Sequence, residues 1–83
     1  MKVLESGDVR LVGLVRQLVA SGDIRRVRQE LGLSVAEVAA VVGVTREAVS
    51  AWERGAIPRT EVALRYGRLL IELTGDLGEA VEP

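Results

Sequence analysis

The segment at residues 33–55, LSVAEVAAVVGVTREAVSAWERG, decides the fold of this chain because it predicts two short helices joined by a tight turn. Ser34 can cap the first helix, and Glu37 stands three residues later, which is the spacing of a capping box. Gly43 ends that helix, since a left-handed residue is least costly for glycine. Thr45 can cap the second helix. So short a connection holds the two helices at a steep angle, which lets one lie across a duplex while the other enters the major groove.

The rest of the chain predicts three more helices and no strand. Six Leu and Val occupy the nine positions 11–19, which is typical of the broad apolar face of an amphipathic helix. Pro58 fixes the backbone ahead of a last helix. We expect helices at about 8–20, 22–31, 34–42, 45–54 and 60–74. The pattern indicates an all-α, small five-helix bundle, with a short lead at 1–7, one domain at 8–75 and an acidic tail at 76–83 that we expect to be mobile.

The composition argues against several kinds of site. The chain has neither Cys nor His, which removes disulfides, thiolate ligands and the usual general base. Its carboxylates do not follow the spacing of a calcium loop, so we expect no metal, no cofactor and no small-molecule ligand. No acid–base or nucleophile constellation is visible, so we expect no catalytic residues and no enzyme. No apolar run is long enough for a membrane span and no signal-peptide pattern is present, which favours a cytoplasmic protein.

Positive charge is concentrated in the middle of the chain. The formal net charge is −1, but residues 25–68 hold eight Arg against five Glu, a local balance of +3. From residue 69 onward there are four acidic residues and no basic one. A duplex responds to the local balance, so an acidic whole-chain pI does not argue against nucleic-acid binding.

The central segment resembles the helix-turn-helix of the phage-repressor and Cro family, also called the xenobiotic-response-element family. The resemblance covers roughly residues 24–70. It rests on features that occur in the family's order: Gly32-Leu33-Ser34, Glu37, Ala39, Gly43-Val44-Thr45-Arg46, Val49-Ser50, Trp52-Glu53-Arg54-Gly55 and Pro58. It implies a lambda-repressor-like DNA-binding fold, to which the helix at 8–20 is an addition.

The helix at 45–54 is then the recognition helix, whose first turn faces the bases. Thr45, Arg46, Glu47 and Ser50 are polar and lie opposite Val49 and Trp52. Arg46 is the best candidate reader of a base because its guanidinium matches the O6/N7 edge of guanine. The resemblance assigns base contacts to positions 46, 47, 50 and 51. Ala51 is shorter than the residue common in the family, so it can contact only a thymine methyl group.

Contacts to the DNA backbone form a separate set. Arg54 and Arg59 match places where the family meets phosphates, and Ser34 can add its hydroxyl at the start of its helix. Val35 stands where the family commonly has a glutamine that grips a phosphate, so the usual clamp is not expected. The resemblance also pairs Arg28 with Glu53, as a structural ion pair that fixes the crossing of their helices.

The leading hypothesis is a sequence-specific transcriptional regulator of double-stranded DNA that acts by occupying an operator in a bacterium or a phage-infected host, at the nucleoid. The alternative is an antitoxin or another protein-interaction module in which DNA binding is secondary. We also expect a homodimer on DNA, with the helix at 8–20, the helix at 60–74 or both in the interface. Packing of the first helix within one copy is the competing prediction.

Overall fold

The computed structural model describes residues 5–75, which form five α-helices and no strand. The helices are α1 (Ser6–Ser21), α2 (Asp23–Glu30), α3 (Val35–Val42), α4 (Arg46–Glu53) and α5 (Thr60–Thr74). The all-α fold predicted from the sequence is confirmed. The first four residues and the acidic tail at 76–83, for which we predicted mobility, lie outside the described residues.

Local capping explains the bounds of α3 and α4. The Ser34 hydroxyl accepts the amide hydrogen of Glu37 at 3.0 Å, and the Glu37 carboxylate accepts that of Ser34 at 2.8 Å, which completes a capping box. Gly43 then ends α3 in the left-handed region, at φ 83°. The Thr45 hydroxyl accepts the amide hydrogen of Ala48 at 3.1 Å and caps α4. The turn between the two helices is therefore set by Gly43, which ends α3, and by Thr45, which caps α4.

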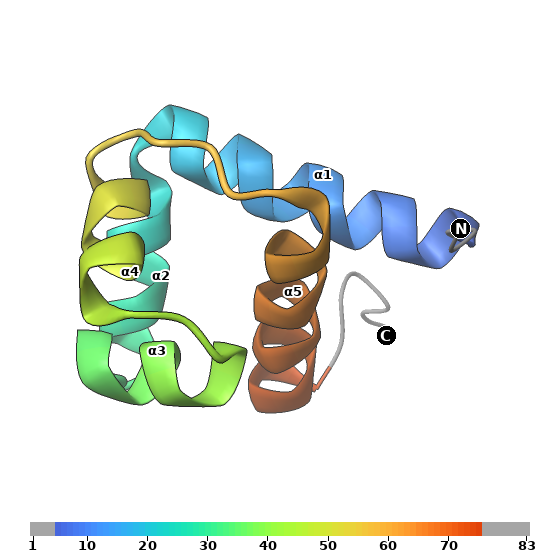
Figure 1. The fold of residues 1–83 in the computed structure, drawn as a ribbon. Helices are drawn as coiled ribbons and strands as arrows, with labels where there is room; N and C mark the ends of the chain where they lie inside the picture. The colour runs from blue at the N-terminus through green and yellow to red at the C-terminus, as the bar shows by residue number, and fades with distance from the viewer. Residues whose placement is uncertain (1–4, 76–83) are drawn as a thin grey trace.

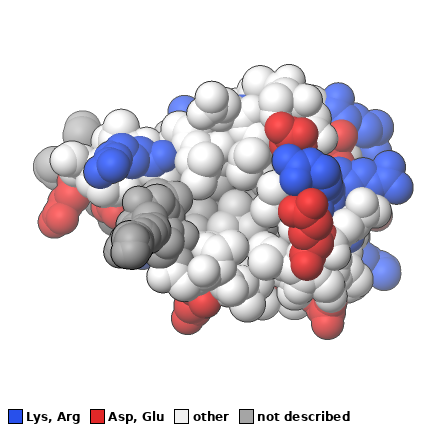
Figure 2. Space-filling view, turned by 180° about the vertical axis from the view of Figure 1, so that it is seen from behind, with Lys and Arg blue, Asp and Glu red and all other residues white. Residues whose placement is uncertain are grey.

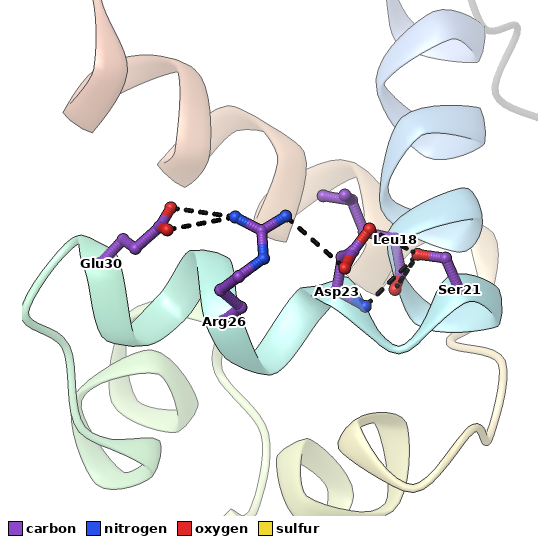
Figure 3. Close-up of polar contacts among 5 residues, drawn as sticks. All are labelled: Leu18, Ser21, Asp23, Arg26 and Glu30. Carbon is purple, nitrogen blue, oxygen red and sulfur yellow. Dashed lines mark hydrogen bonds and ion pairs between the residues drawn. The ribbon is translucent and has the colours of Figure 1, made fainter.

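The junction of α1 and α2 has a single residue between the helices, as we predicted, but it lies one position later in the chain. α1 begins at Ser6 rather than near residue 8, so Asp8 lies in its first turn. Gly22, at φ 84°, both ends α1 and precedes α2. Gly22 has no side chain with which to cap α2, but the amide hydrogen of Asp23 is donated to the Ser21 hydroxyl at an N–O distance of 3.3 Å (Figure 3). One left-handed glycine thus lets two helices follow each other with a single residue between them.

The added helix α1 packs chiefly against α5 and also against α2. In Figure 1, α1 crosses above the other four helices, and α5 descends from it on the side away from α2 and α4. The buried side chains of α1 are Leu11, Val12, Val15 and Val19. Gly67 of α5 allows the close approach, because a Cβ atom there would lie 3.0 Å from Leu11 Cβ and 3.3 Å from its carbonyl oxygen. Most of the apolar face of α1 is therefore used inside one copy.

The helix-turn-helix and α5 share a core. Val38, Val42 and Val49 are fully buried, and the rings of Trp52 and Tyr66 lie 5.9 Å apart between α4 and α5. The Tyr66 hydroxyl is buried and has no hydrogen-bond partner among residues 5–75. Over the same residues, no helix combines the length and apolarity that crossing a bilayer requires, and no group of three or more acidic side chains could hold a metal.

Candidate nucleic-acid interface

The outer face of α4 is polar and unpaired, while its inner face is buried. Thr45, Arg46 and Glu47 are exposed, and Ser50 and Ala51 are half-buried beside them. Neither Arg46 nor Glu47 forms an ion pair or a side-chain hydrogen bond with any residue in 5–75. The Thr45 hydroxyl accepts a capping bond but can still donate its own hydrogen. The structure therefore places the five candidate base-contacting residues on or beside one accessible helix surface.

A buried ion pair holds α4 against α2. Arg28 donates from Nε to Glu53 Oε2 at 2.5 Å and from Nη2 to Glu53 Oε1 at 3.1 Å. Its Nη1 donates to the carbonyl oxygen of Leu33 at 2.7 Å. Each side chain of the pair is only 10% exposed, and the hydrogen bond to Glu53 raises the pKa of Arg28 further above its usual value. This fork fixes two helices and the segment before α3, so it sets how α4 is presented.

The start of α3 offers less to a phosphate than the sequence suggested. Ser34 is exposed, but its hydroxyl and its amide hydrogen are both engaged in the capping box. The Glu37 carboxylate adds a negative charge in the same turn. Val35, at the position of the family's glutamine, packs against the core. Any phosphate contact by Ser34 must therefore come through the hydroxyl hydrogen alone.

The residues after α4 are better placed for the backbone of a duplex. Arg54 and Arg59 are both exposed and form no ion pair with residues 5–75. Arg54 ends α4, and Arg59 directly precedes α5. They flank the connecting loop: Arg54 stands at the end of the recognition helix, whereas Arg59 borders a cavity with Gly43 and Val44, just before the start of that helix.

The sequence left two roles open for Arg25, a phosphate contact in place of the missing glutamine clamp and a favoured surface role in solubility, and the structure brings it beside the recognition helix. A surface cavity of about 300 Å³ is lined by Arg25, Val35, Ser50 and Arg54, together with the Arg28–Glu53 pair. Arg25 is exposed and has no ion-pair partner among the described residues. Because Arg25 comes from α2, no local pattern in the sequence could place it beside Ser50 and Arg54.

Three other arginines are engaged elsewhere. Arg26 lies between two carboxylates of α2, at 3.1 Å from Glu30 and 3.5 Å from Asp23 (Figure 3). Arg68 of α5 pairs with Asp8 of α1 at 3.2 Å. Arg65 donates to the carbonyl oxygen of Val42 at 2.6 Å and so caps the end of α3. These contacts leave Arg25, Arg46, Arg54 and Arg59 as the less committed cations of the central segment.

Charge is unevenly distributed over the molecule. Figure 2, seen from the side opposite to Figure 1, shows basic and acidic side chains interleaved toward the edge where α2 and α4 lie, with basic ones outermost. The middle of the face in this view carries few charged side chains among the described residues. Within residues 5–75, the exposed Arg25, Arg46 and Arg54 form no ion pair, so they supply positive charge beside the recognition helix.

Comparison with known protein families agrees with this geometry. A helix-turn-helix family model matches residues 24–71, more than half of the chain. The chain belongs to the helix-turn-helix family that is found in phage-repressor and Cro-like regulators, and this family binds DNA. The match begins after α1, so α1 is an addition to the family's core. No curated protein and no solved structure matches the chain.

Proposed function

We propose that the protein is a sequence-specific transcriptional regulator of phage-repressor or Cro type that acts by occupying an operator in double-stranded DNA. The observation that carries the proposal is the outer face of α4, where exposed, unpaired Arg46 and Glu47 begin a helix that a buried ion pair holds in place. A rigid helix with free polar groups in its first turn suits the major groove. The protein would work in the cytoplasm, at the nucleoid of a bacterium or a phage-infected host.

Each side chain on this face has a distinct role in the proposal. Arg46 binds the O6/N7 edge of a guanine, and Glu47 accepts from a cytosine amino group or orients Arg46. Thr45 and Ser50 donate or accept beside them. Ala51 contacts a thymine methyl group, and its half-buried position limits it to that. Arg54 and Arg59 bind phosphates, which fixes the register without reading the sequence.

The test is a selection of bound fragments from a random duplex library, followed by affinity measurements on the selected site and on a scrambled duplex. Arg46→Ala should lower affinity for the selected site by about 5- to 150-fold, which corresponds to 1–3 kcal/mol for one bidentate base contact. Affinity for the scrambled duplex should change little. Arg10→Ala is the control, because Arg10 is exposed on α1 and has no ion-pair partner within residues 5–75. Equal losses on both duplexes would reassign Arg46 to the backbone.

The proposal includes a homodimer on DNA, in which two copies read two half-sites about one helical turn apart. Because most of the apolar face of α1 packs inside one copy, the interface must use its remaining edge. Leu14 is half-buried, and Val9 and Leu73 are 54% and 46% exposed. Leu14→Glu should abolish cooperative binding to a two-fold site without unfolding the protein. Leu18 is a poor probe of the interface, because it packs against the core.

The alternative, an antitoxin or another interaction module, predicts a different result. The purified chain alone would then fail to shift a promoter fragment at moderate salt, and binding would appear only with a protein partner. A shift by the chain alone, lost in Arg46→Ala, favours the regulator.

A further inference from the structure

A second, larger cavity adjoins the start of the recognition helix. It has a volume of about 540 Å³ and lies between α1, the turn before α4 and the first turn of α5. Arg16, Arg59 and Arg65 line it, and Glu61 supplies its single carboxylate. Three positive groups against one negative group give the cavity a net charge of +2. A low-dielectric hollow with that charge attracts anions, because its walls concentrate the field.

Arg16 comes from α1, and its guanidinium is held in a fixed orientation. Its Nε donates to the carbonyl oxygen of Pro58 and its Nη2 to the Thr60 hydroxyl, both at 3.2 Å. Figure 1 shows the loop from α4 to α5 running along α1, where these bonds join them. An arginine has five N–H donors, so the described residues leave three of the five on Arg16 for a ligand. Little side-chain entropy remains to be lost when a ligand binds.

Arg65 of α5 also lines the cavity, and one hydrogen bond anchors its guanidinium. Its Nη1 donates to the carbonyl oxygen of Val42, and a Cβ atom at Gly43 would lie only 3.1 Å from that nitrogen. The other donors of its guanidinium form no hydrogen bond with residues 5–75. Arg59 completes the set from the loop. Two anchored guanidinium groups and one exposed one thus border the same hollow.

We infer that this cavity binds a phosphate group and that Arg16 and Arg65 hold it together with Arg59. The volume suits a phosphate with attached sugars, because cavities of this size enclose ligands well beyond a single ion. Gly43 and Val44 form the wall next to Thr45, which caps the recognition helix, so a DNA strand beside the occupied major groove passes here. If the phosphate belongs to DNA, as the proposed function requires, α1 extends the DNA interface beyond the family's core through Arg16. A free phosphate compound is the other source of the same chemistry.

Two assays distinguish the sources, both made on the full chain. The first measures duplex affinity over a series of NaCl concentrations for the wild type, Arg16→Gln, Arg16→Lys and the control Arg10→Gln. Loss of one phosphate contact makes the slope of log affinity against log salt shallower by about one unit. The second measures the thermal midpoint with added inorganic phosphate at constant ionic strength. Circular dichroism establishes that each variant is folded.

For a duplex phosphate, Arg16→Gln should show the shallower slope, while Arg16→Lys and Arg10→Gln keep the slope of the wild type. For a free phosphate, the slopes stay equal, and inorganic phosphate raises the midpoint of the wild type but not of Arg16→Gln. The inference is overturned if Arg16→Gln matches Arg10→Gln in both assays. It is also overturned if Arg16→Lys loses as much slope as Arg16→Gln, since Arg16 would then only brace the loop.

Glu61→Gln gives a test that does not depend on losing function. Glu61 is exposed and has no ion-pair partner among residues 5–75, so its removal leaves the fold intact and makes the cavity more positive. Binding should tighten by roughly two- to fivefold, the scale of one solvent-exposed charge interaction. Weaker binding would contradict the site. A wild type that binds no duplex at all would end the proposed function alone, because the inorganic-phosphate assay still decides this inference.

Discussion

The ion pair between Arg28 and Glu53 gives the sharpest prediction about stability. Glu53→Gln keeps the shape of the side chain but leaves the Arg28 charge unpaired in a site where both side chains are 10% exposed. Breaking a buried pair from one side costs about 3–5 kcal/mol. A chain of this length has a free energy of unfolding of about 4–12 kcal/mol. The substitution should therefore remove at least a quarter of the stability, and it unfolds the protein if the total is near the lower limit.

Urea unfolding followed by fluorescence measures this loss, because Trp52 is the only tryptophan and lies in the core next to Glu53. The matched control is Glu30→Gln, which breaks an exposed pair with Arg26 and should leave the unfolding curve unchanged. The double variant Arg28→Met/Glu53→Leu should recover most of the loss, since an apolar pair of similar volume needs no compensating charge. A loss below about 1 kcal/mol in Glu53→Gln, or one equal to that of Glu30→Gln, would refute the reasoning.

Three further predictions use other parts of the structure. Arg54→Ala and Arg59→Ala should each weaken binding similarly on all duplexes and make the salt slope shallower by about one unit, as measured by titrations over a salt series. Tyr66→Phe should raise the free energy of unfolding by about 1 kcal/mol, because it removes a buried hydroxyl that lacks a partner within residues 5–75. Burial raises the pKa of Tyr66 to about 12, so the stability that the protonated hydroxyl contributes should be fully present below pH 10. The wild-type free energy of unfolding should then fall by about 2 kcal/mol by pH 12. Urea unfolding across this pH range measures the fall, which Tyr66→Phe should lack. Gly67→Ala should lower the thermal midpoint because the added Cβ meets α1. Gly13→Ala should raise it, because Gly13 is exposed on α1 and a Cβ there would meet nothing within 4 Å.

Each of these has a contradicting result. A change in base preference with an unaltered salt slope would place Arg54 or Arg59 at a base edge. A destabilised Tyr66→Phe would mean that the hydroxyl is satisfied, for instance by a buried water. A Gly67→Ala variant as stable as Gly13→Ala would show that α1 can shift at no cost.

The local part of the architecture could be predicted from the sequence because its rules act within a few residues. Ser34 with Glu37 and Thr45 with Ala48 are capping contacts over three positions, so the starts of α3 and α4 follow from spacing. The bounds differ from ours mainly at α1, where a helix can extend past Asp8 because nothing in the sequence stops it at that point.

The tertiary part of the site could not be predicted in this way. Arg16 reaches Pro58 across 42 positions of sequence, and Arg25 meets Ser50 at a cavity formed by three helices. No periodicity encodes such contacts. The pairing of Arg28 with Glu53 was expected only through the family resemblance. Arg26 pairs with Asp23 and Glu30 of its own helix, so its charge is not free for the candidate interface. The sequence thus predicted the recognition helix together with Arg54 and Arg59, but not the positions of Arg16 and Arg25.

The pairing of α1 with α5 has a consequence for synthesis of the chain. Gly67, which receives Leu11, is made 56 residues after it. At roughly 5–20 residues per second, the first helix leaves the ribosome about 3–11 s before its main partner exists. During that interval Val12, Val15 and Val19 stay in water or contact other chains, with α2 as their only partial cover. Translation speed through the helix-turn-helix therefore sets how long every nascent copy carries an aggregation-prone surface.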